Sequence, residues 1–211
     1  RFQLTDIRNS AMKNAGNSAK RIVGVVGVAL AGLSVIGAVI AAGRIETHSP
    51  YEGAASAVVD DKGALRVPAD YQLAYRMLGS WAVAADDAPG SKEMHVVYAS
   101  PGTIAAYRKD GHFPDGTVLV KEVFHTMTDS MTTGTVSSPG TLAGWFVMVK
   151  DDIGRFPENK LWGDGWGWAW FDATTPQKTT STDYKTDCRS CHVPAQASDW
   201  IYTRGYPTLN R

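Results

Sequence analysis

The stretch that decides the fold is Thr117–Met127, TVLVKEVFHTM. It is rich in β-branched residues and long enough to cross a sheet, so it predicts a β-strand. Side chains alternate between the two faces of a strand, so one face carries Leu119, Lys121, Val123, His125 and Met127. A lysine on such a face requires a partner or a covalent role.

Shorter patterns around this strand predict an antiparallel sheet with a few short helices. Strands are expected at 95–99, 144–150 and 166–171, and helices at 70–78, with Asp70 as N-cap, and at 101–109, closed by Asp110-Gly111. Turn-forming residues predict a turn at 137–140, and a polar linker is expected over 174–187. The fold class is therefore a mainly β domain.

The aromatic run WGDGWGWAWF (Trp162–Phe171) has a period of two. Trp166, Trp168 and Trp170 share one face of the expected strand, and small residues occupy the other. One interpretation is that the small-residue face lets a flat group approach while the indoles wall it off. The simpler interpretation is packing within the sheet.

A separate apolar segment precedes this domain. Residues 22–43 carry no charge, and a helix of that length, rising about 1.5 Å per residue, would cross a hydrocarbon core of about 30 Å. The alternative is a cleaved signal peptide, but its apolar part is usually shorter. The segment also contains small residues four positions apart, Gly27/Ala31 and Gly37/Ala41, a spacing that permits close contact between membrane helices.

The charges around this segment predict its orientation. The basic residues before it are Arg1, Arg8, Lys13, Lys20 and Arg21, whereas only Arg44 follows closely. The positive-inside rule then places residues 1–21 in the cytoplasm and residues 44–211 across the membrane, with 22–43 as a single transmembrane helix. The exported part is expected to divide into a linker at 44–54 and a domain at 55–211.

Composition excludes several classes of protein. The chain has 211 residues and a formal net charge of zero, which argues against a nucleic-acid-binding protein. Its two cysteines are too few for a disulfide-dense scaffold, and 44% hydrophobic residues argue against disorder.

Both cysteines lie in the sequence Cys188-Arg-Ser-Cys191-His192. C-x-x-C-H is the attachment signature of c-type haem, in which each thiol bonds one vinyl group and the adjacent histidine ligates the iron. A thioredoxin-like redox pair, a zinc site and a structural disulfide are the alternatives. A redox pair would need a βαβ setting, and zinc would need four ligands.

Two blocks of sequence resemble the cytochrome P460 family, which includes the β-sheet type of cytochrome c′. The tail from Cys188 to Leu209 is one block, and the stretch from His95 through Tyr107 to Glu122 is the other. The resemblance covers roughly residues 55–211. It implies a sheet-rich fold, often dimeric, with one covalently attached haem c held by His192 and an open or weakly occupied opposite face.

Two positions separate members of this family. Lys121 matches the lysine that is cross-linked to haem in the enzymes that oxidise hydroxylamine. The alternative interpretations are a solvated strand lysine and an ion pair with a haem propionate. Phe146 stands where those enzymes carry a carboxylate, and oxidation of an N–H substrate needs such a base. His125 or Glu122 could supply one if the geometry allows. Trp168, with Phe146 and His125, is expected near the haem.

The sequence therefore predicts a membrane-anchored, periplasm-facing cytochrome with one haem c, acting in electron transfer or in binding ligands such as NO. One alternative is an accessory subunit of a respiratory or photosynthetic membrane complex. Another is a hydroxylamine- or NO-oxidising enzyme, which Phe146 disfavours. The expected partners are the membrane and either other subunits of a complex or a second copy of the chain.

Overall fold

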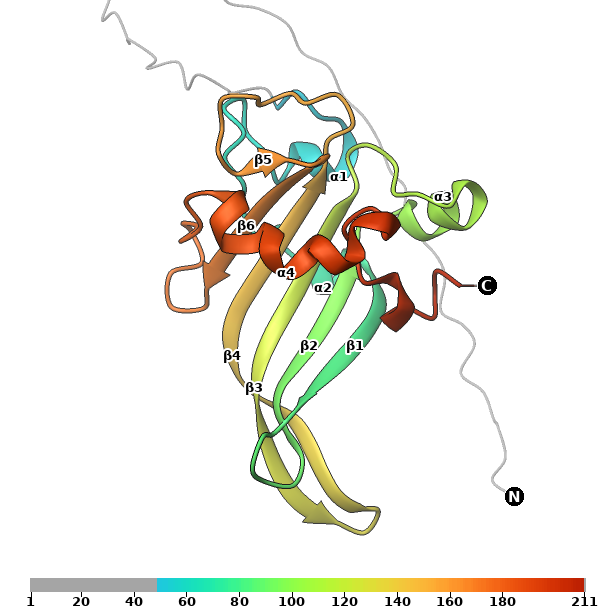
Figure 1. Ribbon diagram of the computed structural model, residues 1–211, viewed down its shortest axis with the longest axis vertical. Coiled ribbons are helices and arrows are strands. Elements are labelled where there is room, and N and C mark those ends of the chain that lie inside the picture. Colours follow the sequence, from blue (N-terminus) through green and yellow to red (C-terminus); the bar gives the residue numbers. More distant parts are fainter. Residues whose placement is uncertain (1–48, 211) are drawn as a thin grey trace, which may run out of the picture. The chain divides into compact units, whose positions relative to one another are not determined.

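The computed structural model describes residues 49–210. Its centre is one antiparallel sheet of six strands in the order β1-β2-β3-β4-β6-β5 (Figure 1). The strands are β1 (Arg76–Ala84), β2 (Ser91–Ala99), β3 (Val118–Met131), β4 (Gly134–Lys150), β5 (Trp162–Gly163) and β6 (Trp166–Asp172). The expected mainly β fold is confirmed.

Helices are short and lie outside the sheet. They are α1 (Gly53–Ser56), α2 (Tyr71–Ala74), α3 (Thr103–Asp110) and α4 (Ser190–His192), with a π-helix η1 (Lys185–Arg189) and 3₁₀ turns η2 (Val193–Ser198) and η3 (Thr203–Gly205). Helix α3 is followed by Gly111, whose left-handed backbone (φ 75°) suits glycine. Within residues 49–210 no helix is long and apolar enough to cross a membrane, and the span expected at 22–43 lies outside the described residues.

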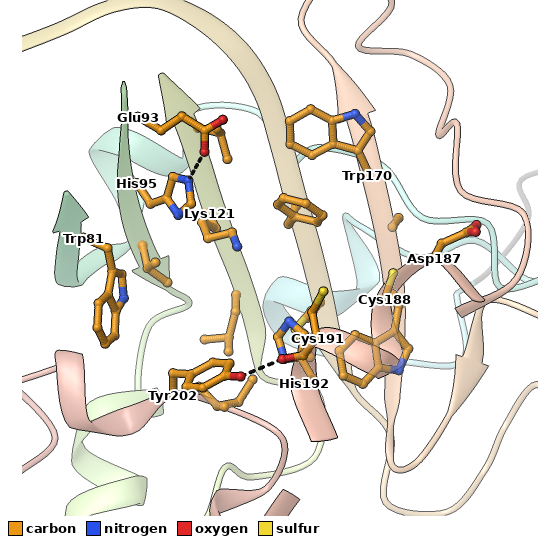
Figure 2. Close-up of a pocket in the computed structure, with 18 of the residues that line it drawn as sticks. Trp81, Glu93, His95, Lys121, Trp170, Asp187, Cys188, Cys191, His192 and Tyr202 are labelled. Atoms are coloured by element: carbon orange, nitrogen blue, oxygen red, sulfur yellow. Dashed lines mark hydrogen bonds and ion pairs between the residues drawn. The ribbon is translucent and has the colours of Figure 1, made fainter. Parts of the chain in front are cut away.

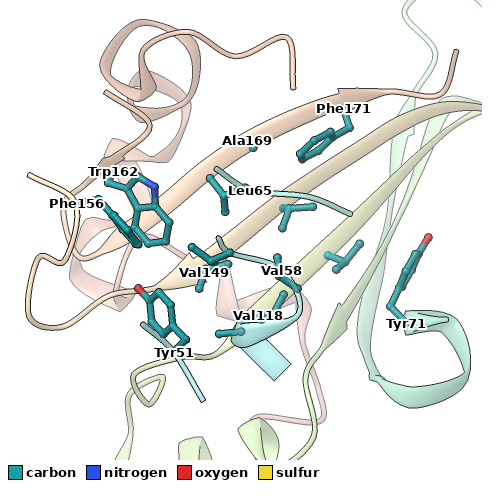
Figure 3. Packing of buried hydrophobic residues seen from close by; sticks show 14 residues of the cluster. Tyr51, Val58, Leu65, Tyr71, Val118, Val149, Phe156, Trp162, Ala169 and Phe171 are labelled. Carbon is teal, nitrogen blue, oxygen red and sulfur yellow. The ribbon is translucent and has the colours of Figure 1, made fainter. Parts of the chain in front are cut away.

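Each face of the sheet is covered by a different part of the chain. One face packs against the N-terminal segment in a buried cluster that includes Tyr51, Val58 and Val149 (Figure 3). The other face packs against the C-terminal segment, which crosses it as the red ribbon in Figure 1 and supplies Trp200 and Tyr206. Both layers are needed because the central strands are buried on both sides.

The helix expected over 70–78 is wrong in extent. Only Tyr71–Ala74 is helical, and strand β1 starts at Arg76. Asp70 has a left-handed backbone (φ 51°) and makes no capping hydrogen bond with its side chain. Leu78 is instead buried in the cluster on the C-terminal side of the sheet, so tertiary packing overrides the local helical preference.

The turn expected at 137–140 is also wrong. The chain reverses at Thr132-Thr133, and Pro139 and Gly140 lie inside β4. Pairing between β3 and β4 is irregular near Phe124, and β6 pairs only with residues 144–150 of β4. Pro139 therefore occupies an edge position beside a bulge, where a missing N–H is tolerated.

Candidate functional site

A cavity of about 670 Å³ lies between the sheet and the C-terminal segment (Figure 2). Its volume falls in the range of sites that hold cofactors and drug-sized ligands. The sheet contributes mostly apolar side chains, namely Val97, Leu119, Val123, Phe146, Met148 and Trp168. The C-terminal segment contributes Cys188, Cys191, His192, Tyr202 and Tyr206. The cavity therefore combines an apolar wall with a wall that carries donor atoms.

The two cysteines lie on consecutive helical segments, Cys188 in η1 and Cys191 in α4. Residues three apart on a helix share a face, so both side chains reach the cavity. Both thiols are free. Burial raises the pKa of the Cys188 thiol to about 11, which keeps it protonated.

Two of the alternatives for this motif, a zinc site and a thioredoxin-like redox pair, find no support in the described residues. No group of three or more His, Cys, Asp or Glu side chains able to hold a metal occurs within residues 49–210, so a zinc site lacks ligands. Every strand pairing of the sheet is antiparallel, so the βαβ setting of a thioredoxin-like pair is missing from the described part of the chain.

His192 is oriented by its neighbours. Its Nδ1 donates a hydrogen bond to the carbonyl oxygen of Trp200 at 2.6 Å. The neutral imidazole therefore carries its lone pair on Nε2, which can ligate a metal. The Trp168 ring packs nearly perpendicular to the imidazole, with ring centroids 5.0 Å apart. Burial lowers the pKa of His192, favouring the neutral imidazole that ligates metals. A hydrogen bond of this type also raises the basicity of a metal-bound imidazole.

Lys121 reaches into the same space as His192 and the cysteines (Figure 2). Its Nζ lies 4.2 Å from the centroid of the Phe146 ring. Burial lowers the pKa of the lysine, and none of the carboxylates in the described part of the chain lies within ion-pair distance of it. This amine is therefore chemically available inside the cavity.

The structure places the other expected site residues on different surfaces. Phe146 and Trp168 line the cavity. His125 does not: it is exposed where β3 continues past the cavity, and the β3–β4 register shifts beside it. Glu122 lies on the opposite face, buried, where its carboxylate accepts hydrogen bonds from Tyr71 and Gln72. Neither His125 nor Glu122 can therefore supply a base to this cavity.

The tryptophan run alternates as expected, but the small-residue face does not admit a flat group. Trp168 and Trp170 line the cavity, whereas a side chain at Gly167 would collide with Trp162. Gly167 thus serves packing against Trp162, and the indoles of Trp168 and Trp170 face the cavity.

Sequence reasoning missed one polar pair in this cavity. Glu93 and His95 on β2 both line it, and His95 Nε2 lies 3.0 Å from a Glu93 carboxylate oxygen. Burial lowers the pKa of His95. The alternation of residues 91–99 could have revealed that these two side chains share the face of Val97.

An antiparallel sheet that carries an apolar cavity, paired thiols and an oriented neutral imidazole defines a haem-binding protein. The chain matches the family model of Cytochrome P460 over residues 68–203, which is more than half of its length. It therefore belongs to the cytochrome P460 family of haem-binding cytochromes. No curated protein matches the chain.

Proposed function

We propose that the chain is a cytochrome with one covalently attached haem c that binds small ligands such as NO or transfers electrons. The observation that carries the proposal is the position of Cys188, Cys191 and His192 on one wall of a single apolar cavity. When bound there, a haem supplies iron for reversible ligand binding and one-electron chemistry. The donors present fit that group.

The roles of the chain's own residues follow from their chemistry. The Cys188 and Cys191 thiols would each form a thioether with a vinyl group, and His192 Nε2 would be the axial ligand. Phe146 and Val123 would present apolar side chains to a ligand in the cavity, which disfavours strongly hydrated ligands. Because Glu122 and His125 lie outside the cavity, neither can act as the base that oxidation of an N–H substrate requires.

A reduced-minus-oxidised spectrum of the purified protein, recorded with and without CO, tests this function. We expect c-type absorption bands and a shift of the Soret band when CO is added. If the haem bands do not respond to CO, ligand binding is contradicted and electron transfer is the function that remains. A spectrum without haem bands would refute the proposal.

One observation favours a second candidate, an enzyme that oxidises hydroxylamine or NO. Lys121 presents its amine to the cavity without a carboxylate partner among residues 49–210, as a lysine that is cross-linked to haem would. A cross-link would red-shift the Soret band, and the Lys121→Met variant would lose that shift. Identical spectra for the two proteins would exclude the cross-link.

We further propose that residues 22–43 anchor the protein in a bacterial inner membrane with the haem domain in the periplasm. The support is the uncharged length of this segment and the excess of basic residues before it. Small residues in the segment suit contact with other membrane helices, either of a second copy or of a larger complex. The test is extraction in mild detergent, followed by measurement of the mass of the extracted particle. A dimer or a larger complex would support contact through the anchor, whereas a protein that is recovered without detergent would contradict the anchor.

A further inference from the structure

The backbone beside His192 contains an unusual pair of residues. Asp199 (φ 58°) and Trp200 (φ 65°) follow one another in the left-handed region, although neither is glycine. L-residues with a large side chain rarely adopt this conformation, and it persists only where the surroundings enforce it. Trp200 is also the residue whose carbonyl oxygen accepts the hydrogen bond from His192 Nδ1.

The sheet holds this pair through Asp199. Lys150, the last residue of β4, places its Nζ 3.0 Å from Asp199 Oδ1 and 3.1 Å from Asp152, and its side chain is only 8% exposed. Trp166, which pairs with Lys150 across β4 and β6, donates its indole N–H to the Asp199 carbonyl oxygen at 3.0 Å. The second carboxylate oxygen of Asp199 is buried and has no hydrogen-bond partner among the described residues, so Lys150 supplies the main compensation for its charge.

A continuous chain of contacts thus leads from the sheet to the histidine. Lys150 fixes Asp199, Asp199 fixes the left-handed turn, and the turn aims the Trp200 carbonyl at His192 Nδ1. The indole of Trp200 is also held, since it is buried and packs edge-on against Trp168, with ring centroids 6.5 Å apart. The geometry leaves the carbonyl little freedom to move away from the imidazole.

We propose that Lys150 is a positioning residue for the axial ligand, acting through Asp199 and Trp200 to set the strength of the His192 Nδ1 hydrogen bond. The inference rests on the proposed function, in which His192 ligates haem iron. A strong bond at Nδ1 gives the imidazole imidazolate character, which strengthens the iron–histidine bond and lowers the reduction potential of the haem.

The test compares Lys150→Met with Lys150→Arg in the haem-loaded protein. Two properties are measured: the reduction potential and the iron–histidine stretching frequency in the resonance Raman spectrum of the ferrous form. We expect Lys150→Met to raise the potential and lower the frequency, and Lys150→Arg to return both toward the wild-type values. If Lys150→Met does not take up haem, Asp199→Asn decides, because asparagine tolerates the left-handed backbone but lacks the charge that pairs with Lys150.

Arg155→Met is the matched control. Arg155 forms ion pairs with Asp115, before β3, and with Asp151, directly after β4, but has none with Asp199. It should lower stability without shifting the potential or the Raman frequency. The inference is overturned if Lys150→Met and Asp199→Asn retain the wild-type values, or if Arg155→Met shifts them as far. A wild-type protein without attached haem would instead refute the proposed function.

Discussion

Replacement of Phe146 by leucine tests how the cavity wall is held together. The Phe146 ring lies 4.5 Å from the Trp170 ring, centroid to centroid, and Lys121 Nζ lies 4.2 Å from its centroid. An aromatic pair contributes about 0.5–1.5 kcal/mol, and a partly desolvated cation–π contact about 0.5–2 kcal/mol. Leucine keeps apolar bulk but loses both interactions, so we expect a loss of about 1–3 kcal/mol in the free energy of unfolding.

The assay is urea unfolding of the haem-loaded protein in a double-mutant cycle. The four proteins are wild type, Phe146→Leu, Lys121→Met and the double variant. If the ammonium group interacts with the ring, the cycle yields a coupling energy of about 0.5–2 kcal/mol. Phe113→Leu is the matched control, because Phe113 is fully buried and packs against Trp166 and Tyr107.

Two results would refute this reasoning. One is a coupling between Phe146 and Lys121 below about 0.3 kcal/mol, the usual error of additivity. The other is an equal coupling between Phe113 and Lys121, which would mean that the cycle reports general loss of packing. A Lys121 cross-linked to haem would also abolish the coupling, and the absorption spectrum identifies that case separately.

Three further predictions concern the frame of the site. Gly79→Ala should lower the melting temperature strongly, because the added Cβ would collide with the carbonyl oxygen of Gly205; an unchanged temperature would contradict the close approach of β1 and η3. Trp166→Phe should cost about 1–3 kcal/mol in urea unfolding, because the Asp199 carbonyl oxygen loses its donor; a cost below about 0.5 kcal/mol would contradict this. Burial lowers the pKa of His95, so below about pH 6.5 the unfolded chain binds a proton more readily than the folded protein, and the free energy of unfolding decreases as the pH is lowered. His95→Gln should make this decrease smaller in acid titrations, and an unchanged dependence of stability on pH would contradict the prediction.

Local sequence was sufficient for the parts of the fold in which propensity and burial agree. The strand around Leu119 and the alternation of the tryptophan run both follow from β-branched or aromatic residues at a period of two. The segment after Asp70 was mistaken for a longer helix because its burial is decided by the C-terminal segment, more than 100 residues away. The turn expected around Pro139 was wrong for a similar reason, because the edge position of Pro139 depends on where β6 stops pairing with β4.

The residues of the site also differ in whether the local sequence predicts their positions. The spacing of Cys188, Cys191 and His192 is encoded in five consecutive residues, and Lys121 is visible from strand alternation. The same alternation places Glu122 on the face opposite Lys121, as observed. The position of His125 depends on the irregular pairing of β3 and β4 beside it, which the local pattern does not determine. The Lys150–Asp199 ion pair joins distant segments and carries no local signature.

The central claim is that Cys188 and Cys191 hold a haem whose iron His192 ligates. The most direct measurement is the intact mass of the denatured protein, with the alkaline pyridine spectrum of the same sample. We expect the mass of the chain plus one haem and the spectrum of haem bonded through two thioethers, with the spectrum shifted in Cys188→Ala or Cys191→Ala, where one thioether remains. A wild-type mass equal to that of the bare chain, with no haem bands, would contradict the account.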